Sequence, residues 1–124
     1  MRHADYSHAT GPSSTSRWTV PATKSAGVID AAGVWDWAPD GGKEIHEIFL
    51  RMTVGAAWGA TSIDVQAVYL NGYVHTISAA VAADTRIAFT GKPSRIRFNA
   101  TAVAAGVTIG VAVQSYTPGD FLVV

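Results

Sequence analysis

The stretch that most constrains the fold runs from Ile63 to Ala79. Apolar side chains recur there at every second position, namely Ile63, Val65, Ala67 and Tyr69. Ser62, Asp64 and Gln66 fall on the opposite face, and this period of two is typical of a β-strand with one buried face. Asn71 and Gly72 follow, and both tolerate the positive φ that a type I′ turn requires at its two central residues. We therefore predict an antiparallel hairpin whose second strand returns from Tyr73.

The same alternation recurs along most of the chain. It marks further strands over residues 45–54, 86–90, 94–100 and 107–113, and a shorter extended step at 34–37. Loops rich in Gly, Pro and Asp separate them, so the count comes to about eight strands with turn signals about every 8–12 residues. We predict an all-β fold: an antiparallel β-sandwich of jelly-roll type.

Size and composition bound the function class. A chain of 124 residues is one domain, and its charged fraction is only 15 %, against the usual quarter. Cysteine is absent, which excludes thiolate metal sites, disulfides and cysteine nucleophiles. The sequence has neither a run of about 20 apolar residues nor the apolar segment of a secretory signal. We therefore expect synthesis in the cytoplasm and no membrane partner.

The two ends differ in composition from the middle. Residues 1–17 carry almost no large apolar side chains, which predicts an extended N-terminal arm that cannot fold by itself. The sandwich domain is predicted over residues 18–124. It ends in four apolar residues, 121–124, which need cover from the protein body or from a neighbour.

Charges are unevenly distributed along the sequence. The acidic group comprises Asp30, Asp36, Asp40, Glu44 and Glu47, and the basic group comprises Arg86, Lys92, Arg95 and Arg97. A polarised protein can dock on a charged surface or pack head to tail. The alternative is that these charges are simply solvated. The basic group does not predict a nucleic-acid partner, because the sequence pI is about 6.9.

No motif predicts catalysis. The sequence has no G-x-S-x-G motif for a nucleophilic serine and no glycine-rich motif for binding phosphate. The spacing of its carboxylates does not single out a pair for general acid/base catalysis. The histidines lack zinc-ligand spacing apart from His3 and His8 in the arm, and residues 36–44 lack the spacing of a calcium loop. We expect a protein that is not an enzyme and that uses neither metal nor cofactor.

Tryptophan leaves two interpretations open. Trp35, Trp37 and Trp58 lie near acidic and glycine residues. Flat aromatic rings beside carboxylates can stack on sugar rings, whereas a tryptophan between two sheets fills a large volume of core. The first interpretation predicts a carbohydrate-binding module, and the second a structural role.

Three features of this sequence are characteristic when taken together. They are a short polar arm, a charge-poor domain rich in Ala, Gly, Val and Thr, and the final strand pair RIRFNATAVAAGVTIGVAVQ (95–114). In this it resembles bacteriophage capsid decoration (cement) proteins, which have a small jelly-roll-like sandwich. The resemblance covers about residues 18–116. It implies a non-enzymatic protein on the capsid surface of a virion that bridges subunits of the major capsid protein and associates with its own copies.

This hypothesis assigns contacts to the ends of the chain and to one polar surface. Residues 1–17 and 121–124 carry the contacts between subunits, and the loop between Asp36 and Glu47 is an alternative polar docking surface. The individual partner-binding residues that we expect are Arg2, Tyr6, Arg17, Arg86, Arg95, Arg97, Phe121 and Leu122. The alternative, a carbohydrate-binding or host-attachment module of a phage tail or head fibre, instead uses Trp35, Trp37 or Trp58.

Overall fold

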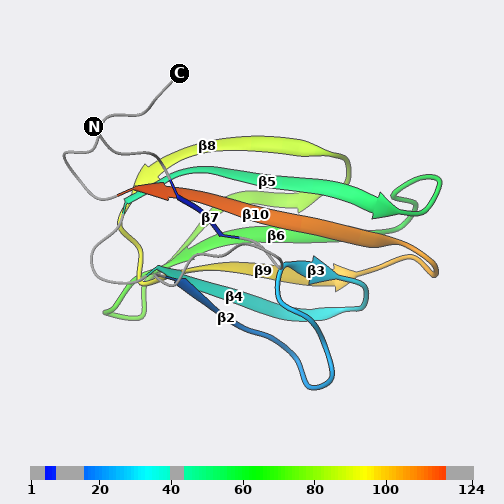
Figure 1. Ribbon diagram of the computed structural model, residues 1–124, viewed down its shortest axis with the longest axis horizontal. Helices are drawn as coiled ribbons and strands as arrows, with labels where there is room; N and C mark the ends of the chain where they lie inside the picture. The colour runs from blue at the N-terminus through cyan, green and yellow to red at the C-terminus, as the bar shows by residue number, and fades with distance from the viewer. Residues whose placement is uncertain (1–4, 8–15, 40–43, 117–124) are drawn as a thin grey trace.

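The computed structural model describes residues 5–7, 16–39 and 44–116, and these residues form two antiparallel sheets without a helix. Sheet A has the order β1 (Asp5–Ser7), β10 (Thr108–Tyr116), β5 (Glu44–Val54) and β8 (Thr85–Gly91), and β3 (Val28–Ile29) also pairs with β10. Sheet B has the order β2 (Ser16–Thr19), β4 (Gly33–Pro39), β9 (Arg95–Ala102), β6 (Ser62–Val68) and β7 (Val74–Val81). The sheets form the two layers of a sandwich (Figure 1).

The all-β antiparallel sandwich is therefore confirmed, while its jelly-roll type stays a prediction. The expected count of about eight strands becomes ten among the described residues, because β1 and β3 are only 3 and 2 residues long. No described segment is a helix long and apolar enough to cross a membrane. In its described parts, the segment predicted as an arm supplies β1 to sheet A and the start of β2 to sheet B.

The core lies between the sheets and follows the period-two pattern. Its largest side chains with under 2 % exposure are Trp35, Trp37, Phe98, Ile29, Ile45, Ile48, Leu50, Ile63, Ile96 and Ile109. The strands leave the core at their ends: Leu50 is 1 % exposed, but Val54 on the same strand is 56 % exposed. Burying the inner faces of both sheets removes apolar surface from water and holds the layers together.

The hairpin between β6 and β7 exists, but its predicted turn type was wrong. The amide of Gly72 donates to the carbonyl of Tyr69 at 2.9 Å, and the amide of Tyr69 donates to the carbonyl of Tyr73 at 2.9 Å. Of the described non-glycine residues only Thr23 and Ala80 have positive φ, so Asn71 does not, whereas Gly72 has φ +87°. Three loop residues therefore join the strands, and the pair of positive φ values that a type I′ turn needs is absent here.

A bulge interrupts β7 before it ends. Ile63 pairs with Val81 and Val65 pairs with Ser78, so β7 carries one more residue than β6 over the same span. Ala80 has φ +52° there, and its amide donates to the Asp64 carboxylate at 2.8 Å. Such a bulge twists an edge strand and limits pairing with other chains.

Asp84 connects three segments at the end of the sandwich. One of its carboxylate oxygens accepts the backbone amide of Met52 and the indole N–H of Trp58, each at 2.9 Å. The bond from Met52, then that from Trp58, lowers the pKa of Asp84 below its ordinary value of 3.8, and the Arg51 charge adds to this. The carboxylate thus attaches the β5–β6 loop to the connection between β7 and β8.

Replacing Ala80 by Gly should stabilise the protein by about 0.5–1 kcal/mol, because alanine is strained at positive φ and glycine is not. The free energy of unfolding in urea measures this. Ala79→Gly is the matched control: Ala79 is also exposed on β7 but lies outside the positive-φ region, so added chain entropy should destabilise it by about 0.5–1 kcal/mol. Equal effects of the two changes would contradict the bulge geometry.

Lowering the pH should remove the contribution of Asp84. The pKa of Asp84 is lower in the folded protein than in the unfolded chain. The stabilisation by its carboxylate is therefore fully present when the pH is above the pKa of the unfolded chain, and it is lost as the pH falls through the pKa of the folded protein. The difference in free energy of unfolding between the wild type and Asp84→Asn should stay constant down to about pH 5 and then narrow below about pH 4. A difference that persists unchanged in strong acid would contradict this account.

Candidate functional site

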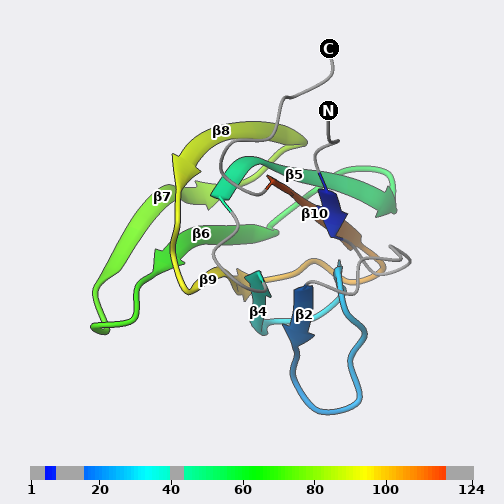
Figure 2. The same ribbon diagram turned by 60° about the vertical axis from the view of Figure 1, so that its left-hand side comes forward.

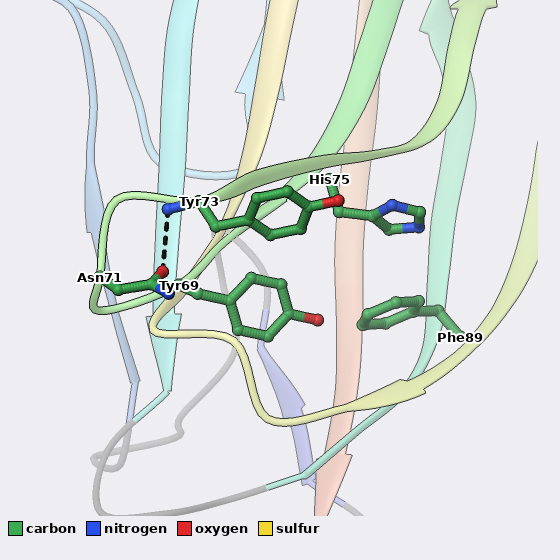
Figure 3. Close-up of a pocket in the computed structure, with 5 residues that line it drawn as sticks. All are labelled: Tyr69, Asn71, Tyr73, His75 and Phe89. Atoms are coloured by element: carbon green, nitrogen blue, oxygen red, sulfur yellow. Dashed lines mark hydrogen bonds between the residues drawn. The ribbon is translucent and has the colours of Figure 1, made fainter.

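An aromatic pocket of about 520 Å³ opens where the edge strands of the two sheets meet. We call it the aromatic pocket, and it is lined by Tyr69, Asn71, Tyr73, His75 and Phe89 (Figure 3). The β6–β7 hairpin supplies four of them, and β8 supplies Phe89. Because β7 ends sheet B and β8 ends sheet A, the pocket lies at the open side of the sandwich, where the hairpin projects from the body (Figure 2).

The rings in this pocket form two layers. Tyr73 and His75 lie above Tyr69 and Phe89 in Figure 3. The Tyr69 and Tyr73 centroids are 6.0 Å apart with an interplanar angle of 34°, and those of His75 and Phe89 are 6.4 Å apart with an angle of 26°. Tyr73 and His75 share a face because they are two residues apart along an extended chain.

Gly91 leaves space for the rings of Phe89 and Tyr69. A Cβ placed on Gly91 would lie 3.0 Å from a ring carbon of Phe89 and 3.7 Å from the Tyr69 hydroxyl. The first distance is shorter than carbon atoms accept without a shift. Glycine at this position therefore lets the Phe89 ring lie over the backbone of β8, which brings the ring into the pocket.

The polar groups around the rings include no carboxylate, ammonium or guanidinium. The Asn71 carboxamide oxygen accepts the Tyr73 amide at 2.9 Å, which fixes the loop and leaves the Asn71 NH₂ group available to donate. Within the described part of the chain, nothing hydrogen-bonds to the hydroxyls of Tyr69 and Tyr73 or to the ring nitrogens of His75. The pocket thus combines apolar ring faces with hydroxyl, imidazole and amide groups.

The same hairpin exposes aliphatic surface. Three of the five large apolar side chains that are exposed in the described part of the chain lie on it: Leu70 at 95 %, Tyr73 at 60 % and Val74 at 41 %. Leu70 and Val74 do not line the aromatic pocket. We call Leu70 and Val74 the hairpin tip, and apolar surface concentrated in this way is typical of a contact site for another molecule.

A second hollow, of about 460 Å³, lies on the outer face of sheet A. Its lining includes Val28, Phe49, Arg51 and Gly110. A Cβ on Gly110 would approach the Thr53 methyl group to 3.0 Å, so glycine keeps this groove open. Phe49 pairs with Ala112 and Arg86 across β5, which places an aromatic side chain among small and basic neighbours.

The tryptophans proposed for sugar stacking lie in the core. Trp35 and Trp37 are 0 % exposed and Trp58 is 7 % exposed. The Trp35 indole N–H donates to the Ser25 carbonyl at 3.0 Å, and that of Trp58 donates to Asp84. Rings buried in this way offer no face to a sugar, so the sugar-stacking assignment does not fit these residues. The period-two pattern had placed Trp35 and Trp37 on one face, but it does not tell which face is buried.

Most of the basic residues expected on a docking surface are paired within the chain. Arg97 makes a bidentate contact with Asp36, from Nε at 3.0 Å and from Nη2 at 3.3 Å, and Arg95 Nε lies 3.3 Å from the same carboxylate. Arg86 pairs with Glu47. The acidic and basic groups of the sequence therefore meet in space, because β4 pairs with β9 and β5 pairs with β8. Acidic and basic residues that are separated along the sequence therefore lie side by side at these pairs, and do not form opposite charged surfaces there.

The remaining predicted contact residues are placed only in part. Arg17 is exposed on β2, and Tyr6 belongs to β1, where it pairs with Gln114. Arg2, Phe121 and Leu122 lie outside the described residues, as do positions 40–43 of the predicted acidic loop. These expected contacts therefore stay predictions.

Sequence reasoning missed the aromatic pocket. It placed Tyr69 on the buried face of a strand, whereas Tyr69 is only partly buried and His75 is exposed. One signal was available: tyrosines on both sides of an Asn-Gly loop must approach each other across the hairpin. No local sequence pattern predicts that Phe89 joins these tyrosines, because Phe89 lies on a strand of the other sheet.

Comparisons with known proteins give no family. No protein-family model matches the sequence, and no curated protein matches it either. Among the described residues, no group of three or more histidine, aspartate and glutamate side chains is arranged to hold a metal ion.

Removing the charge of Asp36 should leave two arginines facing each other. Asp36→Asn should lower the free energy of unfolding by about 1–3 kcal/mol, and the loss should shrink in high salt. Arg97→Gln should cost more than Arg95→Gln, because only Arg97 makes hydrogen bonds to the carboxylate. Urea unfolding of the three variants measures this order, and equal losses at Arg95 and Arg97 would contradict it.

Proposed function

We propose that this chain is a non-enzymatic structural protein of a virion that decorates a phage capsid and stabilises it by bridging major capsid protein subunits. The observation that carries the proposal is the hairpin tip. Leu70 is 95 % exposed at the end of a projecting hairpin, and a fully exposed leucine near the exposed Val74 gains free energy when a protein partner covers it.

Bridging requires two contact surfaces that are separate from each other. The hairpin tip lies at the open side of the sandwich, whereas the groove beside Phe49 lies on the outer face of sheet A. Two partners can therefore be held without competing for the same atoms. The low charge of the protein, with 15 % charged residues, suits apolar contacts, since charged side chains are depleted in the centre of protein interfaces.

A jelly-roll connectivity is part of this proposal and is supported by the strand order. The strands from β3 to β10 form two groups of four, β3-β10-β5-β8 and β4-β9-β6-β7. Of the connections along this series, only the one from β6 to β7 stays within a sheet. Eight strands that alternate between two sheets in this manner are typical of the jelly rolls found in viral capsid and lectin domains.

Binding to capsid shells tests the proposal. The probe is empty shells of the major capsid protein from the genome that carries this chain, and co-sedimentation measures the bound fraction over a range of concentrations. The wild type should sediment with shells, and Leu70→Asp should weaken its apparent affinity by about tenfold or more, because a buried carboxylate would replace an apolar contact.

Val54→Asp is the matched control. Val54 is 56 % exposed at the end of β5, on the other side of the sandwich from the hairpin (Figure 1), so its replacement should leave shell binding unchanged. Absence of wild-type binding would overturn the capsid role. Equal loss in both variants would overturn the role of the hairpin tip. Circular dichroism confirms that each variant remains folded.

A further inference from the structure

We infer that the aromatic pocket binds a neutral saccharide. This inference is independent of the capsid role, because it concerns the pocket face of the hairpin and not the exposed Leu70. It also moves sugar recognition from the buried tryptophans to a different set of side chains, namely Tyr69, Tyr73, His75 and Phe89 with Asn71.

The first step is the match between ring faces and sugar C–H bonds. An aromatic ring has a negative face, which attracts the slightly positive hydrogens on the apolar face of a pyranose ring. Tyr73 is 60 % exposed, and His75 is exposed beside it on the same face of β7. Together with Phe89 from β8 they give a pocket of about 520 Å³, within the size range of small-ligand sites.

The second step is the supply of hydrogen-bonding groups at the rim. The hydroxyls of Tyr69 and Tyr73 and the His75 ring nitrogens have no protein partner among the described residues, and Asn71 keeps its NH₂ group. Hydroxyl and imidazole groups both donate and accept. A ligand with hydroxyls around an apolar ring satisfies these groups and the ring faces at once, whereas a purely apolar ligand would leave the polar groups unpaired.

The third step is the absence of carboxylate, ammonium and guanidinium groups from the lining. None of the five lining residues is aspartate, glutamate, lysine or arginine, so a phosphate or a carboxylate ligand would lose hydration without gaining an ion pair. The lining likewise holds no carboxylate that would pair with a cationic ligand. Its rings form one tilted pair at 34° and one stacked pair at 26°. The geometry therefore favours a neutral ligand.

The pocket is also held in place before any ligand arrives. The hairpin loop is closed by the Gly72 and Tyr69 backbone bonds and by the bond from the Tyr73 amide to Asn71. Gly91 leaves space for the Phe89 ring, because a Cβ there would lie 3.0 Å from a ring carbon. A site that is already formed spends less free energy on ordering its side chains when it binds.

A glycan array followed by titration tests the inference. The full chain is applied to printed neutral and acidic glycans, and the best neutral oligosaccharide is then titrated while the NMR signals of the aromatic side chains are recorded. We expect neutral glycans to bind and to shift the signals of Tyr73 and His75. Tyr73→Ala should weaken binding about tenfold, and Tyr73→Phe should weaken it less, because only the hydroxyl is lost.

Leu70→Ala is the matched control, since Leu70 lies on the same hairpin but does not line the pocket, and it should leave glycan affinity unchanged. Because Tyr73 is largely exposed, its variants should keep the wild-type urea midpoint. The inference is overturned if no neutral glycan binds, if choline binds in the pocket instead, or if Tyr73→Ala and Leu70→Ala have equal effects. None of these outcomes alters the shell-binding result, so the two proposals can fail separately.

Discussion

The structure depends on burying two sheets against each other, because neither sheet is built from strands that are contiguous in the sequence. Between β3 and β10 only β6 and β7 are both consecutive and paired, so almost every pairing closes a loop that passes through the other sheet. Such long-range pairings form only when the apolar faces between the layers compensate the entropy of loop closure. Trp35, Trp37 and Phe98, each 0 % exposed, fill the volume between the layers on neighbouring strands of sheet B. Their burial explains why they are unavailable for ligands.

The same topology decides where charges lie. Acidic residues of the first half and basic residues of the second half are far apart in the sequence, yet Asp36 faces Arg97 across β4 and β9, and Glu47 lies on β5 next to β8, which carries Arg86. Because one carboxylate serves two arginines at Asp36, this patch keeps a surplus positive charge, while the Arg86 pair is balanced. A surface that is locally paired in this way directs contacts toward its apolar parts, which are the hairpin tip and the groove beside Phe49.

The sequence predicted the longer strands, but it did not predict what surrounds them in the folded protein. Alternation over 45–54, 63–69, 94–100 and 107–113 predicted which residues share a face, and Ile48, Val65, Phe98 and Ile109 are indeed buried. It could not predict which face of 34–37 turns inward, because two tryptophans alternate with a valine and an aspartate that suit either side. Nor could it reveal the 2-residue strand β3, whose extended form depends on β10 as a partner. The aromatic pocket stayed hidden for the same reason, since Phe89 joins the tyrosines only through the meeting of two sheet edges.

The edge strand β7 allows the two proposed activities to coexist. Side chains on a strand alternate between faces, so Tyr73 and His75 turn toward the aromatic pocket while Val74, between them, turns the other way. A protein partner that covers Leu70 and Val74 therefore does not need the pocket face, and a saccharide in the pocket does not need the aliphatic face. The Ala80 bulge then ends regular pairing along β7, which disfavours a third use of this edge, the addition of a strand from another chain. The hairpin is thus better suited to contacts through its side chains than to contacts through its backbone.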